Sequence, residues 1–248
     1  MKFLKKKKVL KENGFRMLTY KNRIVFTGGT GRFATAFKSQ QKKTKFEFLF
    51  PKKNQLNILN LKSINYYLKR NKPKYLIHLA GLSRPMSIHE RDINQSIDKN
   101  IIGTCNITKI CSKFKIKLIY VSTCYVYPGK KGNYSENSAL KPINKYAWSK
   151  LGGECAVMLY ENSLILRTSV TEKPFVHKVA FHDFKTNFIF HEDLVLNILK
   201  IIDKKGIFNI GGKSQSVLNF VRKYNPKIKK ISAKKVLGKN APLNVSMN

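Results

Sequence analysis

Two side chains in the segment NKYAWSKLGGE, residues 144–154, are of types that can move a proton together. Tyr146 stands four positions before Lys150, and residues four apart are neighbours on one face of a helix. An ammonium about 5 Å from a phenol, at an effective dielectric of about 20, favours the phenolate by about 3 kcal/mol, or roughly two pKa units. Such a tyrosine can act as an acid near neutral pH. The alternative for any single pair of this kind is a packed tyrosine beside a solvated lysine.

A second candidate site is the glycine-rich segment GGTGRFA, residues 28–34. It follows an apolar run and precedes a helix-like stretch, which is the context of a dinucleotide-binding turn. Gly28 and Gly31 permit a tight turn and a close approach of the backbone to a pyrophosphate, and Ala34 can serve the third small position. The free N–H groups of the following helix can bind the anion. Glycine turns after strands are common, so a simple tight turn is the alternative.

The residues after the second predicted strand bear on which nicotinamide cofactor would bind. An acidic residue at this strand end selects NAD, whereas a basic residue accepts the 2′-phosphate of NADP. Lys52 and Lys53 stand here in the segment FLFPKKN, and Arg32 is expected nearby. These residues favour NADP, with NAD as the second choice. In a lysine-rich chain, two more lysines can also be without meaning.

Both candidate sites need a sheet whose strand ends meet at one edge, and the apolar pattern predicts one. Residues 23–40 indicate a short strand, a glycine turn and a helix, and further apolar runs span residues 45–50, 75–81, 116–123 and 163–169. Helix-sized stretches lie at residues 63–71, 93–114 and 146–160. Strands that are apolar nearly throughout are covered on both faces. The alternation predicts an α/β fold, a Rossmann-type doubly wound parallel sheet with a small C-terminal substrate-binding lobe.

The predicted division of the chain has three parts. Residues 1–20 form a basic N-terminal extension, residues 21–168 form the NAD(P)-binding Rossmann domain, and residues 169–248 form the small lobe. Within the lobe, residues 186–212 predict a strand, a helix that opens with His191, and a second short strand that ends in two glycines. The lobe ends without an obvious closing element, so we expect a C-terminus shorter than is usual for such a lobe.

The net charge of +36 is the most unusual bulk property of the chain. Lysines are scattered through every segment beside many Asn and Ile, as a coding bias toward A and T would also produce. Residues 2–11 and 225–235 are denser in lysine, and the first stretch looks like a basic tail that binds polyanions weakly and without sequence preference. The scattering argues against a protein that acts by charge alone, and we expect no specific nucleic-acid binding.

Cysteine usage and hydropathy bear on the location of the protein. The four cysteines include no C-x-x-C pair, and the N-terminus lacks the long apolar stretch of a signal peptide. No apolar run approaches the roughly 20 residues that cross a bilayer. These features predict a cytoplasmic protein with no membrane span. His177, His182 and His191 fit no common zinc spacing, so no metal site is expected.

Six separated segments resemble the extended short-chain dehydrogenase/reductase family, and they occur in the family's order. They are TGGTGRFA, LNILN (56–60), HLAGLSRP (78–85), NIIGTCNI (100–107), YVSTCYVYPG (120–129) and YAWSKLGGE. Together they cover roughly residues 23–212. Within the family, STCYVYPG, LRTS and GIFNIGG look most like sugar-nucleotide reductases of the dTDP-4-dehydrorhamnose reductase type.

The resemblance implies a role for each matching residue. Thr123, Tyr146 and Lys150 match the catalytic triad of the family. Cofactor contacts are implied for Gly28, Thr30, Gly31, Arg32, Phe33, Ala34, Lys52, Lys53, Asn57, Ile58, Leu79, Ala80 and Gly81, and also for Tyr146 and Lys150. Two differences concern binding: asparagines stand at positions 57 and 60, where aspartates are common, and Cys124 replaces a common aspartate. The Cys124 thiol is expected to be packed rather than nucleophilic.

The chemistry of these residues fits the reduction of a ketone. The cofactor supplies a hydride, and a protein group must supply the proton. Thr123 ends a strand, where its hydroxyl can hold the substrate oxygen against Tyr146. Ser83, Arg84 and Tyr125 follow two strand ends and are expected to contact the sugar or the diphosphate, with ordinary loop residues as the alternative. Arg84 suits diphosphate oxygens best, because a guanidinium matches their geometry.

We therefore predict an NADP-preferring reductase of a nucleotide-linked 4-keto-sugar. A dehydratase of this family would carry Asp-Glu directly after Thr123, where this chain has Cys124 and Tyr125. An epimerase of the same fold and a non-catalytic NAD(P)-binding regulatory module are the alternatives. The expected partner is a nucleotide sugar, and a homodimer is compatible with the sequence.

Overall fold

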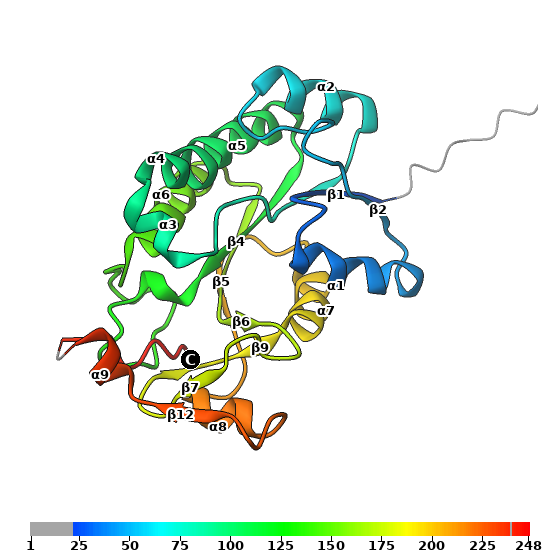
Figure 1. Ribbon diagram of the computed structural model, residues 1–248. Helices are drawn as coiled ribbons and strands as arrows, with labels where there is room; N and C mark the ends of the chain where they lie inside the picture. The colour runs from blue at the N-terminus through cyan, green and yellow to red at the C-terminus, as the bar shows by residue number, and fades with distance from the viewer. Residues whose placement is uncertain (1–21, 239) are drawn as a thin grey trace, which may run out of the picture.

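A six-stranded parallel sheet forms the centre of the computed structural model, which describes residues 22–238 and 240–248 (Figure 1). The strands are β1 (Arg23–Thr27), β2 (Glu47–Leu49), β3 (Tyr75–His78), β4 (Lys117–Thr123), β5 (Ser163–Thr168) and β10 (Gly206–Ile210). Their spatial order is β10-β5-β4-β3-β1-β2, and every neighbouring pair is parallel. The predicted Rossmann-type sheet is confirmed. The predicted basic extension, residues 1–20, lies outside the described residues.

Burial explains why the central strands are apolar nearly throughout. All residues of β3 and β5 are buried, and Val121 is the one residue of β4 that is partly exposed. A strand that is covered on both faces cannot alternate apolar and polar residues, because neither face meets water.

The order in which the chain adds strands to the sheet reverses at β1, and this reversal determines where a ligand can bind. The chain passes from β1 to β2 on one side, and β3 lies on the other side of β1. Thr27 and His78, the last residues of β1 and β3, are paired in register. In open α/β sheets, ligands bind outside the carboxyl ends of the strands at such a switch point.

Helices cover both faces of the sheet (Figure 1). On one face lie α1 (Arg32–Gln40) and α7 (His191–Ile201), and on the other lie α2 (Leu61–Asn71), α5 (Gly103–Phe114) and α6 (Lys145–Met158). Each layer has its own apolar cluster, with Phe37 and Leu194 in the first and Ile64, Ile107 and Val157 in the second. Within the described residues, no helix has both the length and the apolar character needed to cross a membrane.

The predicted helix at residues 93–114 contains a π-helical segment. α4 (Ile93–Ser96) continues into η2 (Ile97–Ile102), which continues into α5. Asn100 lies in the π-helical turn and is buried. Such turns are frequent at functional sites, and this one directs Asn100 at the loop that follows β3.

A small lobe lies below the sheet in Figure 1. It contains three two-stranded sheets: β6 (Val170–Thr171) with β9 (Ile189–Phe190), β7 (Val179–Phe181) with β12 (Lys229–Ile231), and β8 (Lys185–Thr186) with β11 (Gln215–Ser216). α8 (Val217–Arg222) and α9 (Ala233–Leu237) complete it. Its apolar cluster includes Phe184, Val217 and Val245.

Two elements that the sequence grouped with the lobe lie in the layers of the Rossmann sheet. β10 pairs with β5 and extends the sheet by one strand, and α7 packs beside α1 on the sheet face. The chain leaves the sheet after β5, enters the lobe, and then returns. The return depends on long-range packing, and a local apolar pattern carries no information about it.

Candidate active site

The turn between β1 and α1 has the backbone conformation that its glycines were predicted to permit. Gly28 has a φ of +68°, and the N–H of Gly31 donates to the carbonyl of Gly28 at 2.8 Å. A Cβ on Gly28 would lie 2.9 Å from the backbone nitrogen of Ala80. Glycine therefore allows both the left-handed conformation and the close approach to the segment after β3. α1 begins at Arg32, and its first-turn N–H groups are available to an anion.

A buried hydrogen-bond network fixes the segment after β3 against this turn. The Thr27 hydroxyl accepts the N–H groups of Leu79 and Ala80, each at 3.1 Å, and lies 2.6 Å from Nδ1 of His78. Nε2 of His78 lies 3.1 Å from the Thr104 hydroxyl, which donates to a backbone carbonyl at 2.7 Å. Since the only proton of that hydroxyl is engaged, His78 donates from Nε2 and accepts from Thr27 at Nδ1.

His78 is neutral in this network. Burial, and secondly the positive charge of Lys150, lowers the pKa of His78 to about 3. Both ring nitrogens of His78 and the Thr27 hydroxyl have hydrogen-bond partners. The segment predicted to line the cofactor, residues 79–81, is thus held in place by an uncharged buried network.

Thr123, Tyr146 and Lys150 come from two elements at the carboxyl edge of the sheet. Thr123 is the last residue of β4 and is buried, and its hydroxyl accepts the N–H of Tyr125 at 3.3 Å. Tyr146 and Lys150 lie in the first two turns of α6. The side chain of Asn144 accepts a first-turn N–H at 2.8 Å, which caps the helix just before Tyr146. The helix therefore places the phenol and the ammonium one turn apart.

The pKa of Tyr146 moves in the direction opposite to the predicted one. Burial, assisted by Cys124, raises the pKa of Tyr146 to about 12, although Arg84 lowers it. The ammonium of Lys150 contacts a different ring, because its Nζ lies 4.1 Å from the centroid of Tyr120. The prediction that Lys150 lowers the pKa of Tyr146 is therefore wrong for this structure, since desolvation of the phenol dominates. Tyr146 is protonated at neutral pH.

Lys150 is a partly buried cation that forms no ion pair within the described residues. Burial lowers the pKa of Lys150 to about 7, although Glu154, one turn further along α6, raises it. The Tyr120 ring beneath the ammonium is held by its hydroxyl, which donates to the Lys150 carbonyl at 3.0 Å. The charge of Lys150 consequently changes near neutral pH.

Asn100 joins the loop after β3 to the helix that carries Tyr146. Its side-chain oxygen accepts the N–H of Leu82 at 2.7 Å, and its side-chain nitrogen donates to the carbonyl of Leu82 at 2.9 Å and to the hydroxyl of Ser149 at 2.8 Å. Ser149 donates to the carbonyl of Tyr146 at 2.7 Å. A Cβ on Gly81 would lie 2.7 Å from the Asn100 oxygen. The sequence gives no signal for this role, because a π-helical turn leaves the apolar pattern unchanged.

A buried ion pair beneath the triad joins α6 to β5. Glu154 and Arg167 are 0% and 2% exposed, and Nε of Arg167 donates to the Glu154 carboxylate at 2.9 Å. The other carboxylate oxygen accepts the Ser122 hydroxyl at 2.8 Å. A further guanidinium nitrogen donates to the Tyr127 hydroxyl and to the carbonyl of Glu136, each at 3.0 Å. Both charges are extensively hydrogen bonded, as a buried ion pair requires.

His89 packs directly against the candidate proton donor. It lies on α3 (Met86–Arg91), and its ring centroid is 5.2 Å from that of Tyr146 in an edge-to-face arrangement. Nδ1 lies 2.7 Å from the Ser96 hydroxyl, whereas Nε2 has no hydrogen-bond partner among the described residues. Burial lowers the pKa of His89. A neutral, buried imidazole therefore supports one side of the Tyr146 ring, and the sequence alone does not predict this contact.

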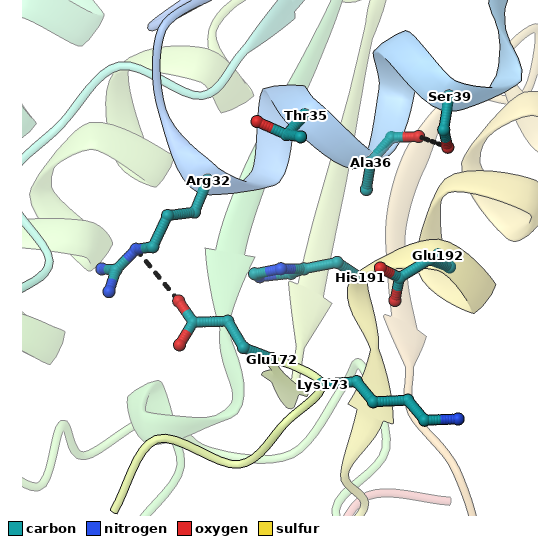
Figure 2. Close-up of a pocket in the computed structure, with 8 residues that line it drawn as sticks. All are labelled: Arg32, Thr35, Ala36, Ser39, Glu172, Lys173, His191 and Glu192. Carbon is teal, nitrogen blue, oxygen red and sulfur yellow. Dashed lines mark hydrogen bonds and ion pairs between the residues drawn. The ribbon is translucent and has the colours of Figure 1, made fainter.

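The two arginines predicted to meet ligand phosphates share one carboxylate. Nε of Arg32 lies 2.9 Å from Oε1 of Glu172, and Nη1 of Arg84 lies 3.0 Å from Oε2. The side chain of Glu172 is 13% exposed, whereas those of Arg32 and Arg84 are 57% and 35% exposed. A cavity of about 310 Å³ lies beside this cluster. Its lining residues, drawn in Figure 2, are Arg32, Thr35, Ala36, Ser39, Glu172, Lys173, His191 and Glu192.

The remaining residues that were predicted to contact the cofactor lie in different environments. Lys52 and Lys53 follow β2 and are exposed, as is Thr30 in the glycine turn. The Phe33 ring stacks on His191 with centroids 4.9 Å apart, so it faces α7. Arg32 forms an ion pair with Glu172.

The segment predicted to flank adenine lies between β2 and α2. The side chain of Asn57 accepts the N–H of Leu59 at 3.1 Å, and the carbonyl of Ile58 accepts from the side chain of Asn106 at 3.0 Å. Asn106 lies on α5. The segment is therefore anchored to the helix layer at the carboxyl edge of the sheet.

The remaining residues of the predicted active site lie directly after Thr123 and in the exposed loop after β3. Cys124 is buried, and burial raises the pKa of its thiol to about 11, which fits the packed role predicted for it. Burial also raises the pKa of Tyr125. Ser83 is exposed beside Arg84. Cys124 raises the pKa of Tyr146 and Arg84 lowers it, so both residues act on the phenol through space.

The sheet order, the glycine turn at the switch point, and the Tyr-Lys pair on α6 together define a protein of the short-chain dehydrogenase/reductase type. The family model described as the RmlD substrate binding domain matches residues 22–179, so the chain belongs to this family.

Curated relatives carry two kinds of name. The chain is 30% identical over 156 residues to methionine adenosyltransferase 2 subunit beta of Xenopus laevis, a match that covers 60% of this chain and 46% of that protein. It is 26% identical over 199 residues to dTDP-4-dehydrorhamnose reductase of Aggregatibacter actinomycetemcomitans, with 78% and 63% covered. The chain thus spans about half the length of the first of these relatives.

Solved structures share the fold at low sequence identity. The dTDP-4-dehydrorhamnose reductase of Bacillus anthracis, determined in complex with NADP, has a TM-score of 0.81 at 22% identity, with 92% of this chain and 90% of that chain covered. The Bordetella bronchiseptica enzyme WbmG, in complex with NAD, has a TM-score of 0.72 at 16% identity, with 91% and 84% covered. At these identities the likeness establishes the fold.

Proposed function

We propose that this protein is an NAD(P)H-dependent reductase of a nucleotide-linked keto-sugar, with Tyr146 as the proton donor. The observation that carries the proposal is that α6, which holds a protonated Tyr146 and Lys150 one turn apart, packs against β4, the strand that ends at Thr123. A relative and a solved neighbour named dTDP-4-dehydrorhamnose reductase support this substrate class.

The residues at the switch point fit a dinucleotide. The backbone at Gly28 approaches the segment after β3 so closely that a Cβ would clash, and the first turn of α1 has free N–H groups for a pyrophosphate. The hydrogen-bonded segment at Leu79 and Ala80 would line the same crevice. NADP is preferred in this proposal, because Lys52 and Lys53 follow β2 where an acidic residue would repel the 2′-phosphate.

Tyr146 supplies the proton in the proposed reaction. The cofactor, when bound, supplies the hydride to the carbonyl carbon, and the phenolic proton passes to the carbonyl oxygen. The pKa of about 12 ensures that Tyr146 holds its proton at neutral pH. Arg84 lowers this pKa, so it stabilises the phenolate that remains after the transfer. In this proposal the Thr123 hydroxyl holds the substrate oxygen, and the packing of His89 against the phenol ring supports the position of Tyr146.

A binding role without turnover is the second candidate. Its support is the set of relatives named methionine adenosyltransferase 2 subunit beta, since a subunit can serve an enzyme without catalysing its reaction. The two functions differ in one respect: a binding subunit retains cofactor affinity but oxidises no NADPH.

The deciding experiment removes the Tyr146 hydroxyl. Tyr146→Phe keeps the ring that packs against His89, so we expect NADPH affinity to be retained while reduction of a 4-keto nucleotide sugar falls by about 10²-fold or more. Tyr66→Phe is the matched control, because Tyr66 is 65% exposed on α2 and should leave the rate unchanged. Single-turnover NADPH oxidation measures the rate, and titration with NADPH and NADH measures affinity and preference.

Three results would contradict the proposal. Retention of more than about a tenth of the rate in Tyr146→Phe would remove the acid assignment. Equal affinity for NADPH and NADH would remove the cofactor preference. Tight NADPH binding by the unmutated protein without oxidation by any keto-sugar would favour the binding subunit.

A further inference from the structure

Glu172 links two loops that the proposed function assigns to two different ligands. Arg32 is the first residue of α1, directly after the glycine turn that would hold the cofactor, and Arg84 belongs to the loop after β3, which would meet the nucleotide sugar. Glu172 directly follows β6. Each oxygen of its carboxylate binds one guanidinium, at 2.9 Å and 3.0 Å. One side chain therefore ties the cofactor turn to the predicted substrate loop.

The charges of this cluster do not balance. Two guanidiniums share one carboxylate, which leaves one positive charge in excess. A guanidinium binds carboxylate and phosphate oxygens through the same planar set of N–H groups. A diphosphate, with a negative charge on each phosphate, can neutralise both arginines and use the same donors. The cluster is therefore better matched to a diphosphate than to the carboxylate it contains.

The position of the cluster makes such an exchange inexpensive. The side chains of Arg32 and Arg84 are 57% and 35% exposed, and ion pairs of exposed side chains add little stability because water competes for the same groups. Glu172 itself is 13% exposed and lies near His191, where burial lowers the pKa of the imidazole and the charge of Glu172 partly opposes that shift. Because Glu172 is held among its neighbours, its negative charge stays near an anion that takes its place. The carboxylate therefore opposes that anion both before and after displacement.

We propose that Glu172 is an anionic latch that a diphosphate ligand must displace from Arg32 and Arg84 in order to bind. The latch holds the two arginines together across the site and reduces the affinity for diphosphates. The identity of the two ligands rests on the proposed function, whereas the displacement is a binding property that can be measured without a cofactor or turnover. Figure 2 shows the Arg32 half of the latch at the edge of the cavity.

The test compares two carboxylates beside the same cavity. Glu172→Gln removes the latch charge with little change of shape, and Glu192→Gln removes an equal charge from an exposed carboxylate that forms no ion pair within the described residues. Titration calorimetry of each full-length protein with inorganic pyrophosphate and with UDP, at one salt concentration, gives the affinities. We expect Glu172→Gln to tighten diphosphate binding about tenfold, equivalent to about 1.4 kcal/mol, and Glu192→Gln to change it less than about twofold.

A second variant tests whether the gain in diphosphate affinity depends on the arginines. In an Arg84→Gln background, Glu172→Gln should bring little additional affinity, because one of the two guanidiniums that it releases is gone. An unchanged or weaker affinity of Glu172→Gln for diphosphates would overturn the latch, since a carboxylate that merely aligns the arginines would be needed for binding. Failure of every protein to bind either probe would overturn it as well.

Different measurements test the latch proposal and the proposed function. NADPH binding without any effect of Glu172→Gln on diphosphates would overturn the latch alone. Absence of NADPH binding and oxidation would overturn the reductase, while the calorimetry would still decide the latch.

Discussion

Two of the carboxylates that arginines bind in this protein, Glu154 and Glu172, lie at different depths. Glu154 and Arg167 are 0% and 2% exposed, and hydroxyl and carbonyl groups complete their hydrogen bonds. Glu172 is shared between Arg32 and Arg84, whose side chains are substantially exposed. The chemical groups in the two clusters are the same, so their surroundings must account for any difference in what they do.

The burial of such a cluster determines whether it mainly stabilises the fold or whether a ligand can replace one of its charged groups. In the interior, neither water nor a free anion can replace a missing member of an ion pair. Removing one charged side chain therefore leaves the other buried without a partner. At the rim of the site, where Arg32 and Arg84 are exposed, water and anions compete for the same donors. The ion pairs there contribute little to folding stability, and a ligand can take the place of the carboxylate. The predictions below test this contrast, from the largest expected effect to the smallest.

The interior pair should be the costlier one to break. Arg167→Met leaves the Glu154 carboxylate buried without its guanidinium, and we expect the free energy of unfolding at pH 7 to fall by about 3–5 kcal/mol. Urea unfolding measures the change. Glu154→Gln combined with Arg167→Met is the control, since it removes the stranded charge and should recover part of the loss. A loss below about 1 kcal/mol for Arg167→Met would mean that depth does not distinguish the two clusters.

Lys150 extends the contrast to a partly buried charge that forms no ion pair within the part of the chain that the structure describes. Its pKa of about 7 means that the ammonium form declines as pH rises above neutrality, whereas Tyr146, with a pKa of about 12, keeps its proton. If the ammonium is required, kcat/KM for the proposed reduction should fall about tenfold per pH unit above pH 7, because this parameter reports the free enzyme. Lys150→Arg should lose this decline, since arginine remains charged. A flat profile up to pH 9 in the unmutated protein would contradict the assignment.

The rim cluster should have the smallest effect on folding. Glu172→Gln is expected to change the free energy of unfolding by about 0–1 kcal/mol, and by less at high salt, where exposed charges are screened. The same urea measurement, repeated at low and high ionic strength, provides the comparison with Arg167→Met. A loss above about 2 kcal/mol would make Glu172 a structural residue and remove the distinction.

Local features of the sequence were sufficient for the main strands of the central sheet, for helices that cover it and for the spacing of the triad. Runs that are apolar throughout predicted the buried parallel strands, because strands covered on both faces have no polar side. The predicted helices at residues 63–71, 93–114 and 146–160 correspond to α2, to the rod of α4, η2 and α5, and to α6. The glycine turn was predictable because a left-handed φ at Gly28 strongly favours one residue type.

The surroundings of each candidate residue were decided by the tertiary structure. The sequence placed Lys150 one turn from Tyr146, but it did not show that the ammonium contacts Tyr120 or that burial raises the pKa of Tyr146. It gave no signal for His89, whose contact with Tyr146 crosses between two helices. Desolvation and through-space contact depend on which elements pack together, and no local spacing records this.

The sequence by itself therefore determined which residue types stand at the strand ends and on the helix faces, because backbone periodicity and glycine conformation are local properties. Only the tertiary structure decided that β10 joins the central sheet, that Asn100 connects the loop after β3 to α6, and that one glutamate is shared by Arg32 and Arg84. These three features bring together segments that are far apart in the chain. Their physical basis is packing and charge at short distance, and both exist only once the chain has folded.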